Sequence, residues 1–207
     1  MILFGLQMTN KKYVYWADNV IPFIYRYPIP LDQMNQIESF VKQTEVAYDW
    51  TNRLISSIPY EKWDDIPEVI ESSVSWQVGH LIVSVYYHSI MVISGHQMDI
   101  LQKIPLKKYD EFYTAAPPKN STGKVDLKEL QSQLVTMQKK SIDIIKSLSV
   151  EDLDRELEPT PIPHPIAKTK FDALDWNIKH AMWHCGQLGI LKRIHGERYD
   201  FGLRRAD

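Results

Sequence analysis

Residues 169–196 read TKFDALDWNIKHAMWHCGQLGILKRIHG. Apolar side chains recur there every three or four positions, which predicts a long helix from about Thr169 to Ile194 with one face packed on a core. Thr169 can cap the amino end, and Gly196 follows the last turn as a natural stop. This segment therefore predicts a helix that needs other helices as packing partners.

Three earlier segments show the same spacing and carry their own end signals. The first is capped by Asp32 and ends before Pro59, the second starts after Ser73 or Ser75 and ends at Gly95, and the third starts at Asp126. Few strand signals occur between them. The four segments predict an all-α protein, a four-helix bundle with long connections.

The connections and the chain ends are less regular. We expect residues 97–122 to form a long loop with one turn of helix, and Ser149 to cap a short helix through residues 151–153. Residues 1–30 are rich in aromatic residues and prolines, and we expect an irregular N-terminal arm that packs on the bundle or across a homodimer contact. The predicted organisation is therefore this arm, a bundle over residues 31–196, and a C-terminal tail over residues 197–207.

Composition excludes several classes of protein. The chain has 207 residues with 24 Lys and Arg against 26 Asp and Glu, so no basic excess is available for nucleic acid. A single Cys excludes an intrachain disulfide and suits a reducing compartment. Residues 72–98 lack charged side chains but contain three histidines, which favours a buried helix over a membrane span. Without a recognisable export signal, we expect a cytoplasmic protein that uses a small-molecule substrate.

The residues with the clearest chemistry are His180 and His184. Histidines four apart lie on one side of a helix, so both imidazoles can reach one metal ion. Position 181 is Ala, and the zinc-peptidase motif needs Glu there, so a peptidase of that type is not expected. The alternative is a pair of polar residues on a partly exposed face. Spacing alone leaves the third ligand open among His80, His88, His96, His164 and His195.

Two motifs together resemble a known family. Residues 75–81, SWQVGHL, and the later pattern His180-x-x-x-His184-x-Gly-Gln-Leu resemble the DinB/YfiT-like family of small metalloenzymes. The resemblance implies a four-helix bundle with a histidine triad on one divalent metal ion, here His80, His180 and His184. It also implies a thiol-dependent transferase or isomerase as one class of activity.

A site of three neutral imidazoles leaves a dication with open coordination positions. We expect zinc or nickel, with iron as a third choice, and a low-molecular-weight thiol that is transferred to an electrophilic small molecule. A metal-dependent hydrolase and a non-catalytic helical assembly protein remain alternatives. Because neutral imidazole binds metals, affinity should fall as pH drops through about 6.5.

Other residues near the predicted site are expected to have minor roles. Gln187 lies two turns beyond His180 and is expected to orient a ligand, while Cys185 is expected to be a small buried residue. Trp76 and Trp183 are expected to be packing residues, with lining of the pocket as the alternative. No general base stands out, and surface or core roles are expected for Glu45, Asp49, Tyr86 and Tyr87.

Overall fold

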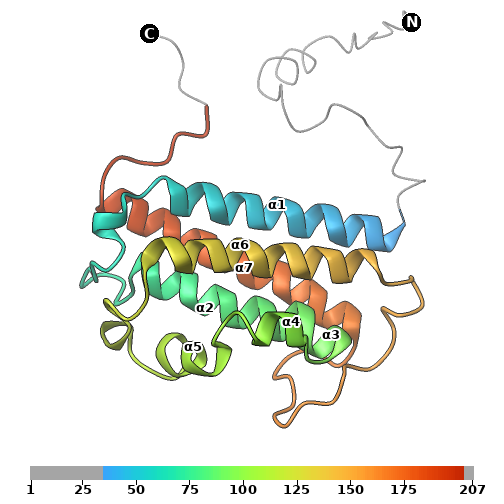
Figure 1. Cartoon of the computed structure of the whole chain (residues 1–207). Coiled ribbons are helices and arrows are strands. Elements are labelled where there is room, and N and C mark those ends of the chain that lie inside the picture. The colour runs from blue at the N-terminus through green and yellow to red at the C-terminus, as the bar shows by residue number, and fades with distance from the viewer. Residues whose placement is uncertain (1–34, 203–207) are drawn as a thin grey trace, which may run out of the picture. The chain divides into compact units, whose positions relative to one another are not determined.

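The computed structural model describes residues 35–202. The predicted arm, residues 1–30, lies outside the described residues, as does Asp32. Residues Asn35–Tyr199 form one compact unit built on long helices (Figure 1). The four long helices are α1 (Gln36–Ser56), α2 (Val74–Tyr86), α6 (Leu127–Lys146) and α7 (Lys170–Ile194). Helix α2 continues through a π turn, η2 (Tyr87–Met91), into the short helix α3 (Val92–Ser94). The prediction of an all-α, four-helix architecture is confirmed.

Local capping explains where these helices begin. Asn35, not Asp32, caps α1, because Glu38 stands three residues later and each side chain bonds the other residue's backbone N–H. The caps predicted at Ser73, Asp126 and Thr169 are present, each accepting from a backbone N–H of the first turn. Gly95 ends the α2–α3 segment with a φ of 78°.

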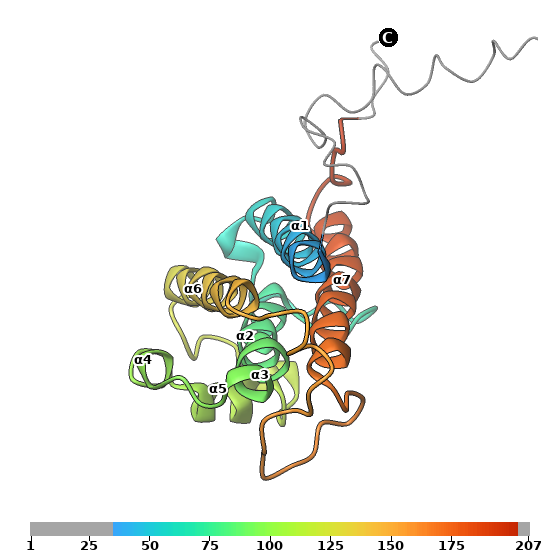
Figure 2. The ribbon, with the colours of Figure 1, turned by 90° about the vertical axis from the view of Figure 1, so that its right-hand side faces the viewer.

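The helices do not alternate in direction along the chain. The Tyr48 hydroxyl bonds Asn177, and Thr51 bonds Cys185, so α1 and α7 are parallel neighbours. The helices α2 and α6 run the opposite way, and an end-on view shows α1 and α2 at opposite corners (Figures 1 and 2). The topology is therefore up-down-down-up, in which α2 and α6 need a long crossover between them.

That crossover is more ordered than the predicted loop with one turn. It carries α4 (Met98–Leu101), α5 (Leu106–Tyr113) and a short 3-10 turn, η3 (Pro118–Asn120). Helix α5 packs on α2 at Gly79, where an added Cβ would lie 2.3 Å from the Tyr113 ring. Only glycine allows this approach, which fixes the end of α5 beside the middle of α2.

The connection between α6 and α7 also differs from prediction. Residues 150–154 form turns and no helix. Ser149 and Asp152 bond each other as a cap would, with the Ser149 N–H donating to Asp152 Oδ2 at 2.8 Å. After this turn, Glu156 pairs with Thr169 in an isolated antiparallel bridge.

The interior combines an apolar core with a few satisfied polar groups. Tyr48 is buried, and its hydroxyl contacts Ser141 and Asn177 at 3.0 Å each. Such bonds remove most of the cost of burying polar atoms between α1, α6 and α7.

Over the described range, no helix is both long and apolar enough to cross a bilayer.

Candidate metal centre

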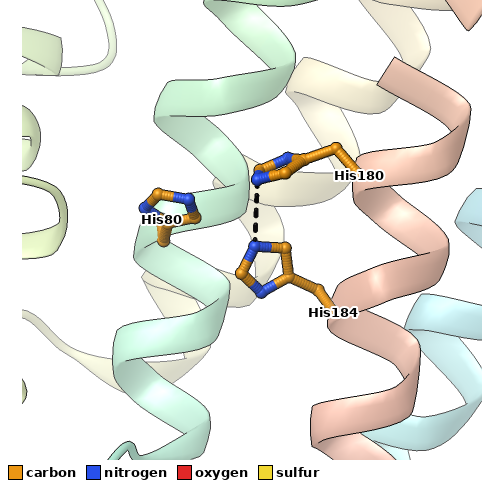
Figure 3. A group of neighbouring side chains, drawn as sticks. All are labelled: His80, His180 and His184. Atoms are coloured by element: carbon orange, nitrogen blue, oxygen red, sulfur yellow. Dashed lines mark hydrogen bonds between the residues drawn. The ribbon is translucent and has the colours of Figure 1, made fainter. Parts of the chain in front are cut away.

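Three histidines from two helices converge between α2 and α7 (Figure 3). His80 comes from α2, and His180 and His184 come from successive turns of α7. One ring nitrogen of each lies within 4.8 Å of the others, and the His180 and His184 Nε2 atoms are 3.2 Å apart. Tetrahedral zinc with bonds of about 2.0–2.1 Å requires nitrogen atoms about 3.3 Å apart. The His180 and His184 pair has this spacing, and together with His80 it forms a group that could hold one ion.

A backbone carbonyl at the end of α5 orients His80. The Nδ1 atom of His80 lies 2.8 Å from the carbonyl oxygen of Tyr113, which can only accept, so Nδ1 carries the proton. The Trp76 ring stacks on the other side, with centroids 4.9 Å apart. These contacts leave Nε2 as the metal-binding atom of His80 and hold its ring plane.

An amide network orients His184. Its Nδ1 atom donates to Gln77 Oε1, because both amide hydrogens of Gln77 are used elsewhere. One goes to Gln187 Oε1 at 2.6 Å and the other to Ser72 Oγ at 2.8 Å. The Nε2 atom of His184 is thus unprotonated and accepts from His180 Nε2. The orienting role predicted for Gln187 is exerted through Gln77.

Burial keeps the three imidazoles neutral. It lowers the pKa of His80, and together with the nearby His80 it lowers the pKa of His180 to about 4. The pKa of His184 is lowered further, by burial first and then by the two neighbouring histidines. Neutral imidazole is the form that binds metal ions, and His180 would bind one through Nε2 with its proton on Nδ1.

The remaining histidines lie outside the triad. His96 Nδ1 bonds the Tyr86 hydroxyl at 3.1 Å, and His195 faces Asp65 at 3.9 Å. His88 Nδ1 lies 2.7 Å from His164 Nε2. The structure thus selects His80 as the residue that joins the α7 pair.

Surface roles hold for the two acidic candidates. Glu45 pairs with Lys146, and Asp49 pairs with Arg53, all with well-exposed side chains. Neither carboxylate contacts the triad. Over the described residues, no Asp or Glu side chain forms a hydrogen bond with these three histidines.

The predictions for neighbouring residues are confirmed in part. Cys185 is buried, and burial raises the pKa of its thiol, which contacts the Thr51 hydroxyl at 3.2 Å. Trp183 is not packed in the interior, because its side chain is 64% exposed. Trp76 packs against His80 and not deep in the core.

Sequence reasoning assigned no role to Gln77 or to the Tyr113 carbonyl. Gln77 stood inside the quoted motif, three residues before His80, and that spacing on a helix is a usable signal for a neighbouring role. The Tyr113 carbonyl is a backbone acceptor, and no side-chain pattern marks which carbonyl a crossover helix will present.

The fold and the site together define a small helical bundle with three converging histidines that could hold a metal ion. Residues 43–188 match the DinB superfamily, and the chain belongs to it. The matched range includes all three histidines and Gln77. A search of curated proteins found no match to the chain.

Proposed function

We propose that this protein is a metal-dependent enzyme that transfers a low-molecular-weight thiol to an electrophilic small molecule. The observation that carries the proposal is the ligand set of three neutral imidazoles with no carboxylate. A divalent ion held there, zinc or nickel by the chemistry of its ligands, would keep its charge and lower the pKa of a bound thiol.

The chain's own residues prepare this step. The Tyr113 carbonyl fixes the ring of His80, and Gln77 fixes the ring of His184. Little reorganisation of these two imidazoles is therefore needed when a ligand binds. In the reaction, the thiol proton passes to solvent, a sulfur–carbon bond forms, and the leaving group departs with the electron pair of its broken bond. This sequence needs no separate base, in agreement with the absence of a carboxylate bonded to the triad among the described residues.

Hydrolysis by bound hydroxide is the second candidate, because a histidine-only site supports it as well. Attack by water usually draws on a positioned general base. Among the described residues no carboxylate is hydrogen-bonded to the triad, which favours the thiol reaction.

The test uses cobalt-loaded protein, 2-mercaptoethanol as the thiol and 1-chloro-2,4-dinitrobenzene as the electrophile. We expect a sulfur-to-cobalt absorption band, release of one proton per bound thiol, and chelator-sensitive release of chloride. His184→Ala should abolish all three, while His96→Ala, which changes a histidine outside the triad, should retain them. Esterase activity towards 4-nitrophenyl acetate without any cobalt–thiol band would replace the transferase with the hydrolase.

A further inference from the structure

A second pair of histidines adjoins the triad. His88 lies in the π turn of the α2 segment, and its ring contacts His180 with centroids 5.3 Å apart. π turns in helices occur frequently at functional sites. On its other side, His88 contacts His164, which belongs to the proline-rich loop before α7. His88 therefore connects this loop with the candidate metal centre.

The loop fixes which nitrogen of His164 carries a proton. The backbone N–H groups of Ile166 and Ala167 donate to His164 Nδ1, at 3.2 and 2.8 Å. An atom that accepts two hydrogen bonds carries no proton, so neutral His164 is protonated at Nε2. The Tyr87 ring stacks on His164, with centroids 5.3 Å apart and planes 8° apart, and holds its orientation.

His164 in turn fixes the tautomer of His88. Its Nε2–H group points to His88 Nδ1 at 2.7 Å, so His88 Nδ1 accepts and the His88 proton lies on Nε2. Nδ1 and Nε2 point to nearly opposite sides of an imidazole. The Nε2–H bond is therefore directed away from the loop.

The same geometry argues against a second metal ion at this pair. Metal binding through His164 Nε2 would require a lone pair there as well as at Nδ1, which a neutral imidazole does not have. The third ligand is also missing, since the triad is the only candidate metal cluster over the described residues. The pair is consequently a chain of hydrogen-bond donors.

Two donors beside the triad have no acceptor in the described part of the protein. No hydrogen bond is formed by His88 Nε2, and Trp76 Nε1 is buried without a partner. Trp76 precedes His80 by one helical turn, and its ring stacks on that of His80. The buried Trp76 N–H group lacks a partner, which costs free energy that a ligand with an oxygen acceptor would offset.

We propose that His88, positioned by His164, donates a hydrogen bond from Nε2 to a carboxylate or carbonyl oxygen of a small molecule bound at the His80–His180–His184 centre. The inference rests on the metal dependence in the proposed function but not on the thiol. A carboxylate is favoured because three neutral ligands leave the charge of a divalent ion uncompensated. His88 is then a ligand-binding residue, and His164 is a positioning residue.

The first test reads the tautomers in metal-free, full-length protein. Nitrogen-15 correlation spectra of the histidine rings should show His88 and His164 both protonated at Nε2. His164→Ala should convert His88 to a tautomer mixture, whereas His164→Gln, whose amide can still donate to Nδ1, should restore the Nε2–H form. A His88 ring protonated at Nδ1 in the unmodified protein would overturn the proposal.

The second test measures acetate binding to cobalt-loaded protein by its visible spectrum. His88→Phe should weaken acetate binding about tenfold, because one hydrogen bond to a charged acceptor is lost. His164→Ala should weaken it less, and His164→Gln should recover it. The control His96→Phe alters a histidine bonded to Tyr86 and should leave acetate affinity within about twofold of the unmodified protein.

The outcomes separate this inference from the proposed function. Acetate affinity that does not change in His88→Phe overturns the role of His88, even if thiols bind the cobalt. Acetate binding that depends on His88, with no cobalt–thiol band, supports the role of His88 and refutes the thiol transferase. A chain that takes up no metal overturns both.

Discussion

Replacing Gly79 with Ala should damage the fold and the metal centre together. The new Cβ would lie 2.3–2.5 Å from three carbon atoms of the Tyr113 ring, whereas carbon atoms in contact are about 3.5 Å apart. The ring, or the whole of α5, must therefore move by about 1 Å. Overpacking of this size costs about 1–3 kcal/mol in the free energy of unfolding.

The same movement reaches the site because Tyr113 holds His80 through its backbone carbonyl. Weakening this bond should lower metal affinity about 10- to 100-fold, the usual cost of losing an orienting contact to a ligand. Urea denaturation of the metal-free protein gives the change in stability. Competition for zinc with a chromophoric chelator gives the change in affinity.

A matched control separates the clash from the loss of a helical glycine. Gly189 also lies in a long helix, but nothing is within 4 Å of the Cβ that alanine would add there. Gly189→Ala should stabilise the protein by about 0.5–1 kcal/mol and leave zinc affinity unchanged. If Gly79→Ala behaves like Gly189→Ala in both assays, the reasoning about α5 and His80 is refuted.

Four further outcomes are expected. Alanine at any of the three site histidines should abolish stoichiometric zinc binding measured by atomic absorption, whereas His96→Ala should retain it. Gln77→Leu should weaken zinc about 10- to 100-fold in the chelator assay, because it removes the acceptor that orients His184. Since the pKa of His180 is lowered to about 4, zinc should still bind at pH 5.5, and an apparent midpoint near 6.5 would contradict the burial argument. The free energy of unfolding of the metal-free protein should decrease from pH 6.5 to pH 4, because the unfolded chain binds protons that the buried histidines exclude, and His88→Phe should make that slope shallower in urea titrations.

The long helices could be predicted because their signals are local. The caps Ser73, Asp126 and Thr169 each precede an apolar pattern at helical spacing, and the bond that each makes lies within the first turn. The α1 cap was misplaced at Asp32 because several polar residues precede the first apolar position. Asn35 is the one with Glu three residues later.

The crossover could not be predicted with the same accuracy. Helix α5 has only eight residues, and an isolated helix of that length is unstable in water. Its stability comes from packing on α2. Its apolar residues Leu106, Tyr109 and Tyr113 are buried only when that partner is in place. The π turn at His88 depends in the same way on tertiary contacts, and no sequence pattern predicts it.

The candidate site also has a part that local sequence predicts and a part that depends on tertiary structure. The helical spacing of His180 and His184 is a property of one segment, whereas the choice of His80 came from the family resemblance. The structure adds what neither source contained, namely that Gln77 and the Tyr113 carbonyl leave Nε2 of two rings free for a metal. The expected pH dependence was based on an ordinary histidine, whereas burial, which cannot be read from the sequence, lowers the pKa of His180 to about 4.

The order of the helices also sets the order in which the site is made during synthesis. His80 leaves the ribosome 100 residues before His180 and 104 residues before His184. A nascent or truncated chain without α7 holds a single ligand, which is too few to retain an ion. The three histidines therefore come together only after α7 has been made and has docked against α2.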